Sequence, residues 1–133
     1  MLMTSIWIAI GGALGTLARF WLNLLVTARL GETMPWGTIL INVTGSFAIG
    51  LFAAATDAHG RFPVSPDMRL FLIVGLCGGY TTFSSFSLQT ITLFETGEGL
   101  RAGANVLLSV FLCLIAVWVG LNAPEGLEKL IRK

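Results

Sequence analysis

The fold is decided by residues 75–87, which read GLCGGYTTFSSFS. The two adjacent glycines and the two β-branched threonines are poor helix formers, because Gly costs about 1 kcal/mol relative to Ala and Thr loses rotamer freedom. The stretch lies in the middle of a long apolar run, residues 70–94. A helix broken there frees backbone carbonyls, which is tolerable at membrane depth only around a bound ion or a cavity.

Three further apolar runs surround this one, at about residues 6–28, 36–55 and 102–121. Each run has the length of about 20 residues that crosses a hydrocarbon core near 30 Å thick. Only 11% of residues are charged, against roughly 25% in soluble domains, and Arg19 is the one charge inside a run. We therefore predict an all-α integral membrane protein of the cell's inner (plasma) membrane. Residues 1–133 would form a single four-helix transmembrane domain with the third helix broken.

A dense set of hydroxyls follows the glycine pair, joined by one amide. In helices, Ser and Thr often bond back to the carbonyl four residues earlier, which needs no further role. So many hydroxyls next to a Gly pair favour a polar pathway instead. The set comprises Thr81, Thr82, Ser84, Ser85, Ser87, Thr90 and the amide of Gln89.

Phe83 and Phe86 are three residues apart and share a helical face with part of this polar set. Aromatic side chains in membranes are usually packing or lipid contacts. An aromatic ring nevertheless has a positive edge. Presented edge-on to a narrow polar path, it could stabilise a small anion without a formal charge.

Asn42 and Arg19, inside the second and first apolar runs, are further candidate site residues. Asn42 needs a hydrogen-bond partner, so it faces either a partner helix or a polar path, and the sequence leaves both open. Arg19 either snorkels to an interface or marks a functional site on an ion pathway. In the second case it would attract anions and repel cations.

The runs contain no acid, which disfavours proton-coupled antiport through a membrane carboxylate and cation channels built on acidic rings. The only histidine, His59, falls between runs, which argues against an intramembrane Ser–His hydrolase. We do not expect an enzyme. A small multidrug-type transporter would need a glutamate in the first helix, and none is present. A non-transporting membrane anchor subunit remains an alternative, but it leaves the hydroxyls and the Gly pair unexplained.

At these residues the chain resembles the Fluc (CrcB) family of fluoride channels. The resemblance covers nearly the whole chain and is carried by the Gly-rich first run with Arg19, by WGTILINVTGSFAIG at 36–50 and by GLCGGYTTFSSFSLQT at 75–90. It implies a fluoride-specific channel for passive fluoride efflux, which relieves toxicity. It also implies an antiparallel, dual-topology homodimer with two pores and a central structural Na⁺ that is not transported.

The family's functional residues carry over to this sequence position by position. The carbonyls of Gly78 and Thr81 from each subunit would hold the sodium, so we expect a replacement of Gly78, which would perturb the backbone, to matter more than side-chain changes at Thr81. The ion pathway would be lined by Asn42, Phe83, Phe86, Ser84, Ser85, Gln89 and Ser109. Gln89 and Asn105 depart from the glutamate and tyrosine that some members carry there.

An even number of helices places the N-terminus, the second loop and the C-terminal tail on one side of the membrane. Excluding the tail, the basic residues divide as Arg61 and Arg69 against Arg29 and Arg101; the tail adds Lys129, Arg132 and Lys133. This near balance makes insertion in both orientations physically plausible.

Overall fold

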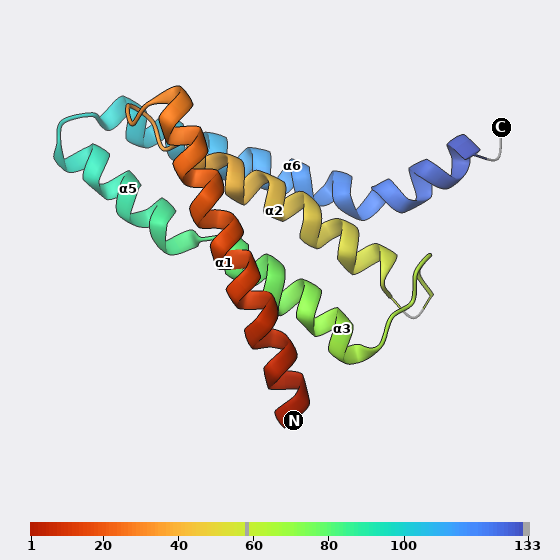
Figure 1. Cartoon of the computed structure of the whole chain (residues 1–133). Helices are drawn as coiled ribbons and strands as arrows, with labels where there is room; N and C mark the ends of the chain where they lie inside the picture. Colours follow the sequence, from red (N-terminus) through yellow and green to blue (C-terminus); the bar gives the residue numbers. More distant parts are fainter. Residues whose placement is uncertain (58, 132–133) are drawn as a thin grey trace.

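The computed structural model describes residues 1–57 and 59–131, with side chains described up to residue 126 (Figure 1). The basic tail residues Lys129, Arg132 and Lys133 therefore lie outside the described side chains. No strand occurs within the described residues. Four helical spans are long and apolar enough to cross a membrane, at Leu2–Leu30, Trp36–Ala55, Pro66–Glu95 and Gly99–Gly126. The predicted all-α, multi-pass membrane protein is confirmed.

The helix bounds agree with the apolar runs to different degrees. Helix α2 is Trp36–Ala55, as predicted, whereas α1 extends beyond its run at both ends, to Leu2–Leu30. Helix α6, Gly99–Ile131, continues past the predicted end at residue 121 and contains Pro124. Backbone hydrogen bonding does not stop where hydropathy falls, so a helix can run on beyond the apolar segment.

The third span consists of several helical pieces. Its first part runs without interruption through α3 (Pro66–Leu70), the π-helical η1 (Phe71–Cys77) and α4 (Gly78–Tyr80). Helix α5 (Phe83–Glu95) begins only after the non-helical link of Thr81 and Thr82. In Figure 1 this link passes behind α1 and separates the two halves of the span. The predicted interruption thus falls on the two threonines.

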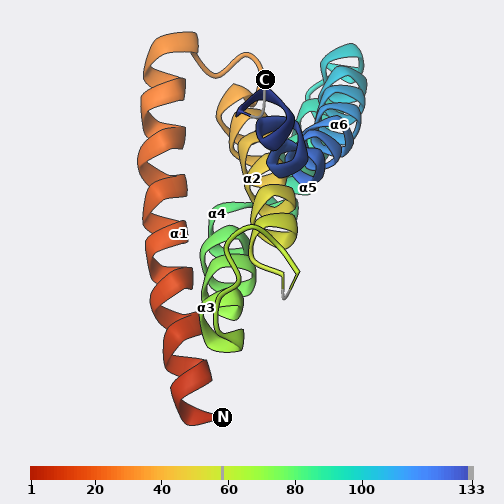
Figure 2. The same ribbon diagram turned by 90° about the vertical axis from the view of Figure 1, so that its right-hand side faces the viewer.

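Close backbone contact joins α1 to the first part of the third span, which lies beside it in Figure 2. A Cβ atom added to Gly11 would lie 2.6 Å from the Phe71 carbonyl oxygen, and one added to Gly75 would lie 2.8 Å from that of Ile8. Small residues at a membrane helix contact allow this approach. The glycines at these positions therefore set the distance between the two spans.

A second glycine contact joins α2 to α6, which run alongside each other in Figure 1. A Cβ atom on Gly50 would collide with the Val117 carbonyl, and one on Gly120 with that of Phe47. Each helix thus provides the glycine that the other helix's backbone needs.

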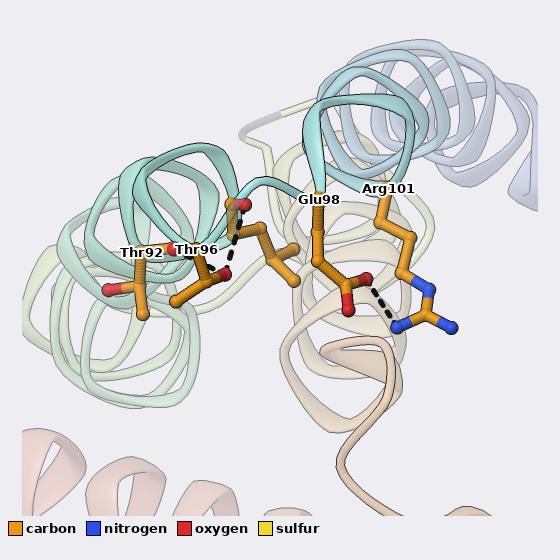
Figure 3. A network of polar contacts seen from close by, with 5 residues as sticks. Thr92, Thr96, Glu98 and Arg101 are labelled. Atoms are coloured by element: carbon orange, nitrogen blue, oxygen red, sulfur yellow. Dashed lines mark hydrogen bonds and ion pairs between the residues drawn. The ribbon is translucent and has the colours of Figure 1, made fainter.

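A tight turn connects α5 to α6. Gly97 has a positive φ of 83°, which L side chains rarely adopt, and the Glu98 amide donates to the Leu93 carbonyl at 2.8 Å. Figure 3 shows the Thr96 hydroxyl bonding back to the end of α5, and Glu98 paired with Arg101 in the first turn of α6. The turn therefore fixes α5 and α6 as a hairpin.

The structure shows no close packing at Gly78, and the expected effect of its replacement on the sodium site stays a prediction. Gly78 has an ordinary helical backbone (φ −65°, ψ −36°), and the nearest atom to an added Cβ would be 3.9 Å away. The sensitive position is its neighbour Gly79, where an added Cβ would lie 2.5 Å from the Gly12 carbonyl oxygen and 2.9 Å from the Gly12 Cα. Backbone atoms cannot move aside as a side chain can.

We predict that Gly79→Ala lowers the free energy of unfolding by about 1–3 kcal/mol, because it overpacks the contact between α1 and α4. Gly78→Ala is the matched control and should change it by less than about 0.5 kcal/mol. Thermal unfolding of both variants in the same detergent measures the difference. Equal melting temperatures for the two variants would contradict the assigned contact.

Candidate functional site

The interruption in the third span is an extended link of two residues. Thr81 has ψ 160°, and Thr82 has φ −154° and ψ 113°. Thr82 caps the N-terminus of α5, where its hydroxyl oxygen accepts from the Ser85 amide at 3.1 Å. The Thr81 amide donates to the Cys77 carbonyl at 3.0 Å. The broken span therefore ends and restarts with local hydrogen bonds.

Asn42 of α2 pairs with the backbone of this link. Its Nδ2 donates to the Thr82 carbonyl at 2.9 Å, and its Oδ1 accepts from the Thr82 amide at 2.8 Å. One side chain thus satisfies both backbone groups of a residue that has left the helix. Asn42 therefore has its hydrogen-bond partner in the broken third span. Its Nδ2 keeps a second N–H that can bind another group.

The hydroxyls of the polar stretch fall into two groups. Thr81, Ser87 and Thr90 donate back to the carbonyl four residues earlier, at 2.9, 2.9 and 2.7 Å, which is the ordinary behaviour in a helix.

The other three hydroxyls cluster at the start of α5. The Thr82 hydroxyl donates to the Ser85 hydroxyl at 3.1 Å and lies 3.2 Å from that of Ser84. The ordinary back-bonding therefore accounts for three of the six hydroxyls, and the pathway interpretation of the other three stays a prediction. The polar cluster is confined to the break.

Phe83 and Phe86 lie side by side, with ring centroids 5.2 Å apart and planes tilted by 50°. Phe86 is buried, whereas Phe83 is 77% exposed. Both line a cavity of about 380 Å³, which we call the phenylalanine chamber. Its polar lining comes from Asn42, Ser46, Thr81, Thr82 and Ser109.

Arg19 lines a second cavity of about 370 Å³, the arginine chamber. The half-buried Arg19 shares it with hydroxyl and amide side chains, namely Thr16, Asn23, Thr38, Thr82, Ser85 and Gln89. No carboxylate lines either this chamber or the phenylalanine chamber. Both chambers therefore offer an anion neutral polar groups, and one of them adds a cation.

A third cavity of about 490 Å³, the outer chamber, lies between the end of α1, the following loop and α5. Asn23 and Gln89 line both the outer and the arginine chambers, and Thr82 lines both the arginine and the phenylalanine chambers. The three cavities therefore form a series from the loop to the two phenylalanines. The break in the third span lies at its second junction.

The structure does not bring every predicted site residue to these cavities. Ser84 is exposed and lines none of the three, although it contacts Thr82. Gly78 also lines none of them, and its carbonyl oxygen accepts no hydrogen bond among the described residues. The carbonyl of Thr81 is likewise free among the described residues.

Asn105, which the sequence marked only as a departure from the tyrosine of some family members, is a buried polar residue that joins two helices. It is 0% exposed, its Nδ2 donates to the Thr90 hydroxyl at 2.8 Å, and its Oδ1 accepts from the Ser109 hydroxyl at 3.3 Å. It therefore ties α5 to α6 and orients Ser109 in the phenylalanine chamber. The available signal was an amide inside an apolar run with a serine four residues later.

Fold and site together define a small multi-pass membrane protein with a series of polar cavities that meet at a broken helix. The family model described as "CrcB-like protein, Camphor Resistance (CrcB)" matches residues 6–121. The chain belongs to the CrcB family.

The chain is similar to three bacterial proteins that are each named "Fluoride-specific ion channel FluC". The protein from Methylocella silvestris is 58% identical over 118 residues, covering 89% of this chain and 90% of the relative. The one from Rhodospirillum rubrum is 55% identical, covering 89% and 92%. The one from Methylobacterium radiotolerans is 60% identical, covering 88% and 81%.

We predict that Asn42→Leu lowers the free energy of unfolding by about 2 kcal/mol or more, because it leaves both backbone groups of Thr82 without a partner. Ser87→Ala, which removes only a hydroxyl bonded back within α5, should change it by less than about 0.5 kcal/mol. Thermal unfolding in detergent compares the two variants. If Asn42→Leu unfolds at the parental temperature, the pairing does not hold the break.

Proposed function

We propose that this chain forms a fluoride-specific ion channel that lets fluoride leave the cell passively and so relieves its toxicity. The observation that carries the proposal is the series of cavities that meets at the broken third span, where neutral donors surround one cation and two phenylalanines. The names of the relatives support the choice of ion. In bacteria, the source of these relatives, the channel would lie in the plasma membrane.

The proposed ion pathway uses the residues that the family resemblance indicated. Fluoride is small and strongly hydrated, so the path must replace lost water with many donors. The second N–H of Asn42 and the hydroxyls at the break can provide some of them, and positive ring edges add weak support. The pathway residues are Arg19, Asn42, Phe83, Ser84, Ser85, Phe86, Gln89 and Ser109.

Two other functions can be distinguished from a fluoride channel by one flux experiment. A small multidrug-type transporter would need a membrane-embedded carboxylate, whereas no acid lines the two inner chambers. A non-transporting anchor subunit would not need a series of neighbouring polar cavities. The purified protein should be reconstituted into liposomes loaded with fluoride, with a fluoride electrode outside. We expect rapid fluoride release and no chloride release. Fluoride release no faster than from fluoride-loaded liposomes without protein would overturn the proposal.

We predict that Phe83→Ile and Phe86→Ile each lower the fluoride flux by about tenfold, since Ile keeps most of the bulk but removes the ring quadrupole, whose interactions are worth about 1 kcal/mol or more. Phe94→Ile, an exposed ring on the same helix outside the chambers, is the control. The electrode assay measures all three variants. Parental flux through both pathway variants would assign these rings to packing.

We further propose that two copies associate as an antiparallel homodimer. Four helices are too few to enclose a path, and Phe83 is 77% exposed although it lines the phenylalanine chamber. Large apolar side chains are also exposed along α1, such as Phe20, Trp21 and Leu24. A second copy would cover part of this surface and close the chamber, and lipid would cover the rest.

We predict that the protein inserts in both orientations in its native membrane, because its loop charges are nearly balanced. With Cys77 and Cys113 replaced by Ala, a single cysteine at Thr33, which is exposed between α1 and α2, reports the orientation. About half of the Thr33→Cys molecules should react with an impermeant thiol reagent from each side. Reaction from only one side would exclude dual topology.

We also propose a structural Na⁺ at the dimer centre, held by the carbonyls of Gly78 and Thr81 from each copy. The donor set fits, since both carbonyl oxygens are free of hydrogen bonds among the described residues and oxygen ligands suit a hard cation. Bound sodium would supply positive charge between two chains and so stabilise their contact. A dimer equally stable in sodium and choline salts would contradict this role.

A further inference from the structure

The outer and arginine chambers meet at two side-chain amides. Asn23 of α1 and Gln89 of α5 are the residues that line both cavities. On the outer side the lining includes Glu32, and on the inner side it includes Arg19. An anion moving inward from the loop therefore leaves the neighbourhood of a carboxylate, passes two neutral amides and reaches a cation.

Both amides have unused hydrogen-bonding capacity at this junction. Gln89 Oε1 is buried and has no partner among the described residues. The side chain of Asn23 forms no hydrogen bond with the described residues. Rotating the Gln89 side-chain amide by 180° exchanges Oε1 and Nε2, so that two N–H donors can also face the junction. A buried oxygen such as Gln89 Oε1 is normally satisfied, so the junction calls for a mobile occupant such as water or an ion.

Gly37 makes the room in which the Asn23 amide lies. A Cβ atom on Gly37 would overlap Asn23 Oδ1 and lie 3.0 Å from Asn23 Cγ and 3.3 Å from Asn23 Cα. The open space next to this amide consists of the two chambers that it lines. A side chain at position 37 would therefore push the amide into their junction.

We propose that Asn23 and Gln89 form a neck through which fluoride passes between the outer and arginine chambers, and that Gly37 keeps this neck open. The proposal rests on the proposed function. The amide N–H groups replace part of the ion's hydration shell. Because the amides are neutral, they do not hold the anion as a second cation would.

The flux test uses four variants. Asn23→Leu keeps the size but removes the donors, and its fluoride flux should fall by about tenfold or more, the loss of one hydrogen bond to a charged group. Gly37→Ala should also lower the flux. Serine at position 23 is shorter than asparagine and keeps a donor, so the double variant Asn23→Ser/Gly37→Ala should conduct within about twofold of Asn23→Ser alone. Gly103→Ala, where a Cβ meets nothing within 4 Å, is the matched control and should conduct like the parent.

Two flux results would overturn the neck. One is parental flux through both Asn23→Leu and Gly37→Ala. The other is a loss in Gly37→Ala that Asn23→Ser does not restore, because the defect then comes from displaced helices rather than from the amide. Size-exclusion profiles confirm that each variant folds before its flux is compared.

A labelling test is independent of transport, so the neck and the proposed function can fail separately. Thr27→Cys places a thiol in the outer chamber, and Thr38→Cys places one in the arginine chamber. Asn23→Trp should slow reaction of a water-soluble thiol reagent at position 38 by about tenfold and leave position 27 unchanged. Equal reaction rates at position 38 with Asn and Trp at position 23 would overturn the neck even if the protein conducts fluoride.

Discussion

The pairing of the Asn42 amide with the Thr82 backbone is the interaction on which the rest of the site depends. Inside a membrane a helix can be interrupted only where the freed amide and carbonyl find partners in the protein. Asn42 provides an acceptor at 2.8 Å and a donor at 2.9 Å from one side chain. With Thr82 held in this way, its hydroxyl can cap α5, and the chain can change direction without leaving either group of this residue unsatisfied.

The position of α5 follows from that pairing. Its first residue, Phe83, and the buried Phe86 face the cavity that Asn42 also lines, while Ser85 faces the neighbouring cavity with Arg19. Each helical residue rotates the following side chains by about 100°. If Thr81 and Thr82 were helical, the side chains of α5 would therefore point in other directions. The meeting of two cavities at Thr82 is thus a consequence of the break. The glycine contacts of α1 with η1 and α4 hold the first part of the span in place on the other side.

Sequence patterns predicted the features that depend on composition and local propensity. Hydropathy located the four spans, and the weak helix formers at 78–82 located the interruption. Features that depend on side-chain direction were not predictable. Spacing does not distinguish Thr90, which bonds within its own helix, from Thr82, which gathers two serines.

Contacts between distant residues escaped prediction for the same reason. The position of the Asn23 amide depends on Gly37 of another helix, and the hydrogen bonding of Asn105 depends on Thr90. The motif alone also does not distinguish Gly79, which the close contact with α1 requires, from its neighbour Gly78, which has the dihedral angles of an ordinary helix.

The order in which the helices pair has a consequence for how the protein is made. Helix α1 contacts the third span closely, and α2 contacts α6, so each early helix has its main partner late in the chain. During synthesis the first two helices enter the bilayer before either partner exists, and lipid must solvate their glycine faces in the meantime. The close contact of α2 with α6 can therefore form only after the last helix has been synthesised.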